Sequence, residues 1–289
     1  MKIGFIGAGK VGFTLGKYLK ENGIDVSGYY SKSGESSLEA SIFTKTKQYE
    51  NLGTLVKESD AVIITTPDDK ILEVWDKLKK LSIKNKFICH CSGSLSSDIF
   101  SKVCDHSAYA YSIHPMFPIS DKYKSYSFFK DAFITIEGDK QKIHEVKAFI
   151  EGLGNKVKVI EKENKVLYHL SSVVSSNFVL GLINTSIKYL EKCGFSNREA
   201  LEALYPLIDN NISNINFKGT VNSLTGPIER GDLNTIKNHY DAINIEDKKL
   251  YNLLSNVVLK IAKEKNKGKD YEELGMFLGG RDEEYSSNI

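Results

Sequence analysis

Residues 3–12 read IGFIGAGKVG, an apolar strand-like run that turns glycine-rich just before a helical pattern begins. The three glycines have the spacing G-x-G-x-x-G and stand where a strand, a tight turn and a helix should follow one another. The first glycine of such a turn permits the turn itself, the second lets the backbone approach a pyrophosphate, and the third lets helix and strand pack closely. The helix N-terminus adds unpaired N–H groups for an anion. This stretch therefore predicts a dinucleotide-binding unit at the start of the chain.

The first half of the chain alternates strand-like and helix-like segments. The β-rich runs lie near 2–6, 25–30, 60–66, 86–91, 108–113, 132–137 and 156–160. Amphipathic helical stretches lie between several of them, at 10–22, 34–43, 68–81 and 140–153. Strands that alternate with helices of this length indicate βαβ units, so we expect an α/β, doubly wound, mostly parallel sheet.

The second half has a different pattern. Helical periodicity extends over roughly 162–192, 197–216, 232–243 and 246–265, with a short helix near 270–277. We therefore predict a nucleotide-binding domain over 1–158 and an all-α substrate domain over 159–289, to which the resemblance described below adds a role in dimerisation. No flexible linker separates the two patterns, which favours two packed domains with a cleft between them.

Composition excludes several classes of protein. The 289 residues suit about two domains, and 41% hydrophobic with 26% charged residues is ordinary for a globular protein. A net charge of +2 gives no reason to expect a nucleic-acid partner. No apolar run approaches the roughly 20 residues that span a bilayer, and the glycine-rich N-terminus does not look like a signal peptide. With four cysteines and no disulfide framework, we expect a cytoplasmic protein without a membrane partner.

The end of the second predicted strand bears on the choice of nucleotide. Residues 28–33 read GYYSKS, with no carboxylate before Glu35 to bind the ribose 2′-hydroxyl of NAD. Hydroxyls flanking Lys32 instead suit the 2′-phosphate of NADP, although Lys32 could also be an ordinary solvated loop lysine. We predict NADP (NADPH) as the cofactor. The predicted cofactor-binding residues are Gly7, Gly9, Lys10, Val11, Gly12, Ser31, Lys32, Ser33, Thr66, Pro67 and Ser92.

Three further polar stretches should leave the carboxyl ends of strands, where doubly wound sheets bind their ligands. They are residues 65–68, residues 91–94 and residues 112–116, and each is interpreted as a loop. Any one could be an ordinary turn, but together they predict that Thr66, Ser92 and His114 line the nicotinamide end, with His114 near the substrate.

A polar stripe follows on the first long helix. At 100° per residue, His169, Ser172 and Ser176 share one side of the helix, and Asn177 lies about 80° away from His169. Histidine can give or take a proton near neutral pH, so we predict His169 as general acid/base and Asn177 as an orienting residue. The two serines would contact the substrate. A hydrogen-bonded interhelix cluster without a catalytic role is the alternative.

The segment 224–232, LTGPIERGD, is the second polar cluster of the helical half. Glycine and proline predict a turn, and Asp232 can N-cap the next helix. Arg230 is one of three arginines among 39 basic residues, which favours a role that lysine fills poorly, such as gripping a carboxylate. We predict Arg230 as a substrate anchor in the catalytic set and Thr225 as a substrate contact. An elaborate helix–helix connection is the alternative.

The sequence predicts no metal site. Cys89 and Cys91 should face one side of a strand and His90 the other, which is poor zinc geometry, and no second pair of ligands follows nearby.

These motifs together resemble a bacterial family of Rossmann-like NADP-dependent oxidoreductases whose C-terminal part is known only as a domain of unknown function. The resemblance rests on the 7–12 loop, the 112–116 stretch, the His169 to Asn177 helix and the 224–232 segment. More distantly, the chain is similar to pyrroline-5-carboxylate reductase and to the 6-phosphogluconate and 3-hydroxyisobutyrate dehydrogenases. That similarity implies a helical C-terminal domain that dimerises, and hence a homodimer. In the hydroxyacid dehydrogenases a lysine is followed four residues later by asparagine, whereas here Lys165 is followed by His169.

The sequence thus leads to one main hypothesis. It is an NADP-dependent oxidoreductase that moves hydride between the nicotinamide and a small polar metabolite, such as an imine, a keto acid or a hydroxy acid. Two alternatives remain, a non-catalytic NADP(H) sensor and an enzyme that reduces a deazaflavin.

Overall fold

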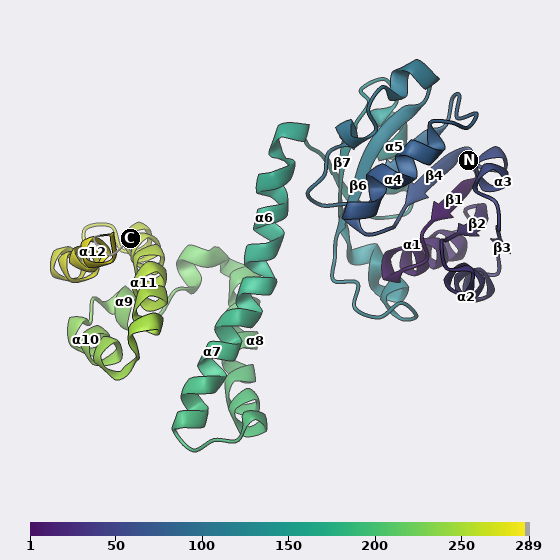
Figure 1. The fold of residues 1–289 in the computed structure, drawn as a ribbon. Coiled ribbons are helices and arrows are strands. Elements are labelled where there is room, and N and C mark those ends of the chain that lie inside the picture. The colour runs from purple at the N-terminus through teal and green to yellow at the C-terminus, as the bar shows by residue number, and fades with distance from the viewer. Residues whose placement is uncertain (287–289) are drawn as a thin grey trace. The chain divides into compact units, whose positions relative to one another are not determined.

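The N-terminal part of the computed structural model, which describes residues 1–286, is built on one eight-stranded sheet (Figure 1). The strands are β1 (Ile3–Ile6), β2 (Val26–Tyr30), β3 (Lys47–Gln48), β4 (Ala61–Ile64), β5 (Phe87–His90), β6 (Tyr109–Met116), β7 (Phe133–Gly138) and β8 (Lys156–Val159). Their order is β3-β2-β1-β4-β5-β6-β7-β8, and every neighbouring pair is parallel except β6 and β7. The predicted doubly wound sheet is confirmed, whereas the short β3 was not expected.

Residues 112–116 correct one expectation, because they are not a loop. They form the second half of β6, and His114 pairs with Thr135 of β7. The reason is tertiary: β7 runs antiparallel to β6, so it gives β6 a partner beyond the point where the parallel β5 ends. His114 is consequently presented from a strand rather than from a loop.

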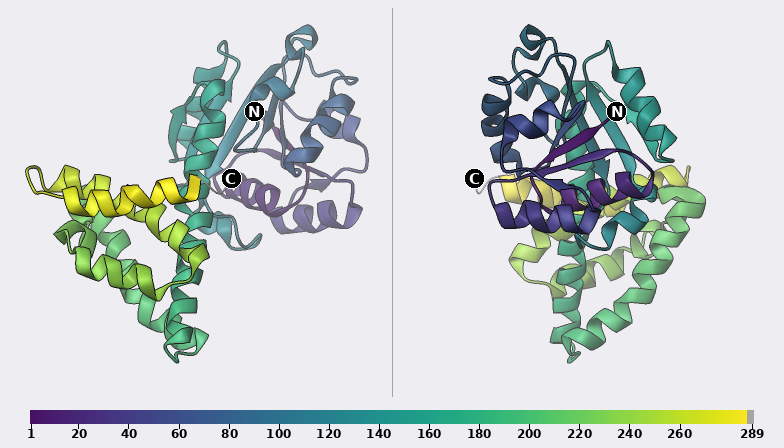
Figure 2. Two further views of the ribbon diagram at one scale, coloured as in Figure 1. Left: turned by 60° about the vertical axis from the view of Figure 1, so that its left-hand side comes forward. Right: turned by 90° about the vertical axis from the view of Figure 1, so that its right-hand side faces the viewer.

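Helices cover both faces of this sheet (Figure 2). The α-helices are α1 (Lys10–Glu21), α2 (Gly34–Thr44), α3 (Leu52–Lys57), α4 (Asp68–Leu78) and α5 (Ile143–Gly152). Short 3₁₀ helices are η1 (Ser97–Ile99), η2 (Val103–His106) and η3 (Ser125–Asp131). The unexpected α3 is only six residues long, too short for its periodicity to stand out in the sequence.

Two apolar cores hold these layers together. On one face, α1, α2, η3 and α5 pack on the sheet around Phe13 and Phe129, both fully buried. On the other face, α3, α4 and η2 pack around Trp75, which contacts Phe100 edge-to-face with ring centroids 5.4 Å apart. The nearly continuous apolar run of β4 is explained by its contribution to both cores, with Ala61 and Ile63 on one face and Val62 and Ile64 on the other.

The helical part begins directly after β8. Its elements are η4 (Lys162–Asn164), α6 (Lys165–Ser175), α7 (Asn177–Lys192), α8 (Asn197–Ser223), α9 (Pro227–Arg230), α10 (Leu233–Ala242), α11 (Ile245–Lys265) and α12 (Glu272–Ser286). The prediction of one unbroken helix over 162–192 is wrong, because the chain leaves helical geometry at Ser176 (φ −122°, ψ −73°). The helix predicted to end near 216 stops close to that point, because Gly219 has non-helical geometry (φ +76°, ψ 172°), and a short helical segment follows from there to Ser223.

The chain divides into two compact units, Met1–Gly181 and Leu182–Ile289. The first unit contains the sheet together with α6 and the start of α7. Within the second unit, α10, α11 and α12 share a small core that includes Ile236, Leu259 and Leu274. The functional division into 1–158 and 159–289 stays a prediction.

The segment Lys162–Lys192 corrects a further expectation. An 18-residue window within it has a mean hydropathy of 1.5, so by length and composition alone it could cross a membrane. Its apolar side chains are largely exposed, including Leu167 (68%) and Phe178 (55%). Exposed apolar side chains of this kind are equally typical of a helix that packs against another protein chain.

Candidate functional site

The glycine turn after β1 has the geometry that its sequence predicts. Gly7 has φ +104°, and a Cβ there would lie 2.9 Å from the backbone nitrogen of Thr66. A Cβ on Gly12 would lie 2.8 Å from the carbonyl oxygen of Gly7, so the helix packs tightly on the turn. At Gly9, in contrast, a Cβ would meet nothing within 4 Å. The turn is therefore closed on its inner side and open where a pyrophosphate would lie.

A cavity of about 440 Å³ adjoins this turn. The structure brings six of the predicted cofactor residues together in its wall: Gly7, Gly9, Ser31, Lys32, Thr66 and Pro67. The hydroxyl Oγ1 of Thr66 is buried and has no hydrogen-bond partner among the described residues. A buried hydroxyl without a partner is unfavourable unless a ligand completes it. The residues present thus fit a bound dinucleotide.

Other predicted cofactor residues lie outside this wall. Lys10 and Val11 begin α1, and Gly12 lies behind the turn. Ser33 caps α2 by accepting a hydrogen bond from the backbone nitrogen of Ser36 at 3.5 Å. Their contact with a cofactor stays a prediction.

Sequence reasoning missed two lysines in the same wall. Lys70 and Lys77 project from α4 into the cavity that Lys32 lines. Lys77 also forms an ion pair with Glu73, at 2.8 Å between Nζ and Oε1. The missed signal was their spacing of seven residues, which places both on one side of a helix.

The loop after β5 is fixed by Ser92. Its hydroxyl donates a hydrogen bond to Asp68 Oδ2 at 2.6 Å and accepts one from the backbone nitrogen of Leu95 at 3.0 Å. Its backbone nitrogen donates to Nδ1 of the buried His90 at 3.2 Å. Burial lowers the pKa of His90 to about 4, so this ring is neutral at pH 7. Ser92 therefore shapes the loop, and its predicted contact with the cofactor stays a prediction.

Lys165, the first residue of α6, lies beneath this loop and is only 2% exposed. Its Nζ donates to the carbonyl oxygen of Ser92 at 2.9 Å and to the hydroxyl of Ser112 at 2.5 Å. Burial lowers the pKa of the Lys165 ammonium to about 8. In the sequence, Lys165 stands out only through its spacing to His169, and it is not among the predicted site residues. The signal in the sequence that could have identified Lys165 is a charged residue at the start of an otherwise apolar helix.

Two histidines and a tyrosine complete this cluster. Nδ1 of His114 and the hydroxyl of Tyr168 are 2.7 Å apart, and the ring of His169 lies 6.4 Å from that of His114, centroid to centroid. A Cβ on Gly93 would lie 2.5 Å from Cδ2 of His169 and 2.9 Å from Nε2 of His114. Burial, with the nearby charge of Lys165, lowers the pKa of His114 to about 4. The structure thus brings the loop after β5, the strand β6 and the helix α6 into contact. We call Lys165, His114, Tyr168 and His169 the polar cluster.

The predicted stripe on the first long helix is divided by the break at Ser176. The hydroxyl of Ser172 is buried without a partner among the described residues. Ser176 and Asn177 are exposed, and the Ser176 hydroxyl donates to the Ser172 carbonyl oxygen at 2.6 Å, while Asn177 Oδ1 lies 2.9 Å from the same hydroxyl. Their predicted roles toward a substrate stay predictions.

Thr225 and Arg230 belong to the second unit, where both are exposed. The predicted N-cap is confirmed, because Asp232 Oδ1 accepts a hydrogen bond from the backbone nitrogen of Thr235 at 3.1 Å. Glu229 is bound to its own unit, since its side chain accepts from Asn266 Nδ2 at 2.9 Å. These contacts support a structural role for part of the segment, while the substrate roles of Thr225 and Arg230 stay predictions.

Among residues 1–279, whose side chains the structure describes, no group of three or more His, Cys, Asp or Glu side chains is placed to hold a metal ion.

Two known families match separate stretches of the chain, and the second match begins just before β7, so it includes the last two strands of the sheet. Residues 1–115 match the Rossmann-like domain family. Residues 132–258 match a domain of unknown function, DUF2520. The chain joins a Rossmann-like domain to a DUF2520 domain. This confirms the resemblance inferred from the motifs. No curated protein matches the sequence.

Solved structures resemble the chain over nearly its whole length. A protein from Thermotoga maritima is 28% identical, with a TM-score of 0.74, over 91% of this chain and 99% of its own. A proposed NADP oxidoreductase from Bacteroides fragilis is 24% identical, with a TM-score of 0.71, over 90% of this chain and 98% of its own. A pyrroline-5-carboxylate reductase from Coxiella burnetii shares the fold at 14% identity, with a TM-score of 0.60, over 92% of this chain and 98% of its own.

Proposed function

We propose that this protein is an NADP-dependent oxidoreductase that transfers hydride between the nicotinamide and a small polar metabolite, such as an imine, a keto acid or a hydroxy acid. The observation that carries the proposal is the cavity beside the glycine turn. There an open backbone cradle, an unpartnered buried hydroxyl on Thr66 and a basic side chain at Lys32 line one space. The likeness to a proposed NADP oxidoreductase supports it.

Different residues of the chain bind different parts of the dinucleotide. Backbone N–H groups near Gly9 and at the start of α1 bind the pyrophosphate. Ser31 and Lys32 bind the 2′-phosphate, supported by the charges of Lys70 and Lys77 in the same wall. When bound, the nicotinamide supplies or accepts the hydride.

The polar cluster stabilises the charge that develops on the substrate and transfers a proton to or from it. With a pKa of about 8, Lys165 is mostly protonated at pH 7, so its ammonium stabilises negative charge that develops on a nearby substrate oxygen. His169 acts as the general acid/base, and Asn177 and Arg230 orient and anchor the substrate. Tyr168 holds the neutral His114 ring by one hydrogen bond.

We further propose that the domain over 1–158 binds the nucleotide and that the helical domain over 159–289 forms a homodimer. Large apolar side chains exposed on the helical domain support this, including Leu167 (68%) and Phe217 (86%). A cytoplasmic location belongs to the same proposal.

Nucleotide binding is the first test. We expect NADPH to bind more tightly than NADH in a fluorescence titration. Lys32→Ala should weaken NADPH binding about 10- to 100-fold, because a charge-assisted hydrogen bond contributes about 1.5–3 kcal/mol, and should leave NADH binding nearly unchanged. Lys84→Ala is the matched control, since Lys84 is exposed and lies outside this cavity. Equal affinities of the unmodified protein for both nucleotides would contradict the choice of NADP.

Turnover is the second test. The protein is incubated with NADPH and a panel of imines, keto acids and aldehydes, and the absorbance of the reduced nicotinamide is followed. We expect oxidation with one class, reduced at least tenfold in His169→Ala. Tight binding without oxidation of NADPH by any class would favour a sensor. Full turnover by His169→Ala would remove that histidine from the mechanism.

A further inference from the structure

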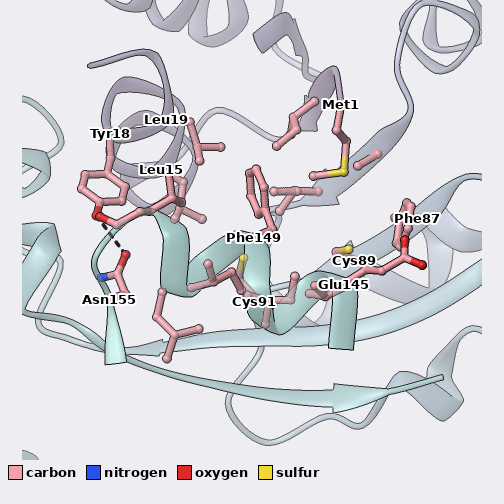
Figure 3. A pocket seen from close by; sticks show the side chains of 18 of the residues that line it. Met1, Leu15, Tyr18, Leu19, Phe87, Cys89, Cys91, Glu145, Phe149 and Asn155 are labelled. Carbon is pink, nitrogen blue, oxygen red and sulfur yellow. Dashed lines mark hydrogen bonds between the residues drawn. The ribbon is translucent and has the colours of Figure 1, made fainter. Parts of the chain in front are cut away.

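The unit Met1–Gly181 contains a second cavity, of about 510 Å³, on one face of the sheet (Figure 3). Strands β1, β4, β5 and β6 form its floor, with Ile3, Ile63 and Cys89 among the floor residues. Helices α1 and α5 form its sides, where Leu19 and Phe149 line it. The cavity lining shares no residue with that of the cavity beside the glycine turn.

The connections of the sheet explain why this space exists. On this face, α1 connects β1 to β2 and α5 connects β7 to β8. The connections that follow β4 and β5, by α4 and by η1 and η2, contribute instead to the core on the opposite face. No crossover α-helix among the described residues therefore lies over β4 and β5 on the α1 and α5 side. The apolar side chains of these strands face the open space.

The polar groups at both ends of the cavity already have partners. Figure 3 shows Tyr18 and Asn155 at one end, where the tyrosine hydroxyl donates to Asn155 Oδ1 at 2.9 Å. Asn155 Nδ2 in turn donates to backbone carbonyl oxygens, including that of Phe129 at 2.8 Å. At the other end, Glu145 pairs with Lys142 at 2.5 Å. Asp60 also lines the cavity, and its carboxylate accepts a hydrogen bond from the backbone nitrogen of Lys2 at 2.7 Å. Both Asp60 and Glu145 are exposed residues, so their charges are solvated at the rim rather than buried against a ligand.

The floor between these ends is apolar and buried. Ile3 is 1% exposed, and Ala61 and Cys89 are each 3% exposed. Water gains few hydrogen bonds in such a space, and apolar cavities accordingly bind small apolar molecules. The volume lies in the range of small-molecule pockets, about 300–1,000 Å³.

We propose that this cavity is a second ligand site, which binds a small, neutral, apolar molecule. The proposal does not depend on the oxidoreductase function, because it rests on a separate cavity. The two thiols of β5 make the site directly observable, since Cys89 and Cys91 both line it. The other two cysteines, Cys104 and Cys193, are exposed.

The first experiment is a titration of the full chain with N-phenyl-1-naphthylamine, a neutral fluorescent probe. We expect saturable binding of one probe per chain, and at least a tenfold loss of affinity in Ala61→Leu, which adds a larger side chain to the floor of the cavity. Leu167→Ser controls for binding to the exposed apolar helix and should leave the affinity unchanged. Lys32→Ala should also leave it unchanged, which separates this site from the nucleotide cavity.

The second experiment locates the probe and does not require a core substitution. In the Cys104→Ser/Cys193→Ser protein, Cys89 and Cys91 are labelled with N-ethylmaleimide and the labelling rate is followed by mass spectrometry. Saturating probe should slow this labelling at least fivefold. If labelling is not slowed, the proposal is overturned, whether or not Ala61→Leu folds. Loss of probe binding in Leu167→Ser would overturn it equally, by placing the probe on the helix surface.

Discussion

At the scale of single residues, Lys165 connects the fold to the proposed chemistry. A buried ammonium is unfavourable unless hydrogen bonds compensate it, and here Ser92 and Ser112 provide them. The compensation is incomplete, so the pKa falls to about 8. Lys165 therefore loses its proton within a range of pH where enzymes are readily assayed.

This pKa gives a prediction for the pH dependence of turnover. As pH rises through about 8, the charged fraction of Lys165 falls, so kcat should decline if the ammonium stabilises the developing negative charge. Lys165→Met should lower kcat at least tenfold at pH 7 and abolish that alkaline decline. Lys162→Met is the control, because Lys162 is exposed and pairs with Asp98 at the surface. An unchanged alkaline limb in Lys165→Met would assign the decline to another group.

The two neutral histidines predict a loss of stability in acid. The folded-state pKa values of His90 and His114 are about 4, whereas an unfolded histidine has a pKa of about 6.5. Above pH 6.5 both states are neutral and the histidines contribute no pH dependence. As pH falls from 6.5 toward 4, the unfolded chain binds protons that the folded chain does not, so folding stability decreases. At pH 5 the loss is about 2 kcal/mol for His90, and less for the partly exposed His114.

Urea unfolding at pH 7 and pH 5 measures this loss. Trp75 is the only tryptophan of the chain and is fully buried in the sheet unit, so its fluorescence reports the unfolding of that unit. His90→Gln should reduce the difference between the two pH values by about 2 kcal/mol. His144→Gln should not, since His144 is exposed. The same pH difference in wild type and His90→Gln would exclude His90 as the cause.

At the scale of elements, the loop after β5 is the point where the proposed site is most sensitive to packing. Gly93 lies so close to His169 and His114 that any Cβ would collide with both rings. Gly93→Ala should therefore displace the imidazoles, lower kcat at least tenfold and destabilise the protein by about 1–3 kcal/mol. NADPH binding should be retained, because the glycine turn is a separate element.

Kinetic assays and urea unfolding of Gly93→Ala measure both effects. Gly152→Ala is a matched control, since a Cβ at Gly152 would meet nothing within 4 Å. Wild-type turnover in Gly93→Ala would show that the loop does not position the histidines for catalysis.

The break between α6 and α7 also belongs to this scale. The hydroxyls of Ser175 and Ser176 donate to carbonyl oxygens four residues earlier, at 2.9 and 2.6 Å. Such bonds compete with the helix ladder and bend helices. Helical periodicity continues through this segment, so a pattern of apolar residues alone predicted an unbroken helix.

At the scale of the whole molecule, the helical domain exposes large apolar side chains, and we infer that another protein chain covers them. Tyr205 and Phe217 of α8 are 62% and 86% exposed. Surfaces of this kind mark association sites, and a second copy of the chain is the partner that we propose.

Sedimentation equilibrium tests this association. We expect a mass of about twice the 32.4 kDa of one chain, and Tyr205→Ser/Phe217→Ser should weaken dimerisation at least tenfold. Leu72→Ser is the control, because Leu72 is comparably exposed on α4, outside the helical domain. A monomeric wild-type protein would contradict the proposal, and association with lipid vesicles would point to a membrane instead.

The sequence by itself determined the local features of this protein. The glycine spacing over 7–12 predicted a strand, turn and helix, because each requirement is met by residues next to one another in the chain. The alternation of strands and helices predicted the doubly wound sheet, and Asp232 was identified as an N-cap from its place before a helix. Ser31 and Lys32 were likewise placed beside the glycine turn by their position at the end of β2.

Only the tertiary structure decided which distant groups meet. Lys165 contacts the Ser92 carbonyl 73 residues earlier in the chain, and its burial arises from that contact rather than from its neighbours in sequence. Gly93 is confined by rings from β6 and α6, and the apolar cavity exists because no crossover helix lies over β4 and β5 on one face. Desolvation and close packing depend on the whole set of surrounding atoms, and local periodicity carries no information about atoms that arrive from elsewhere in the chain.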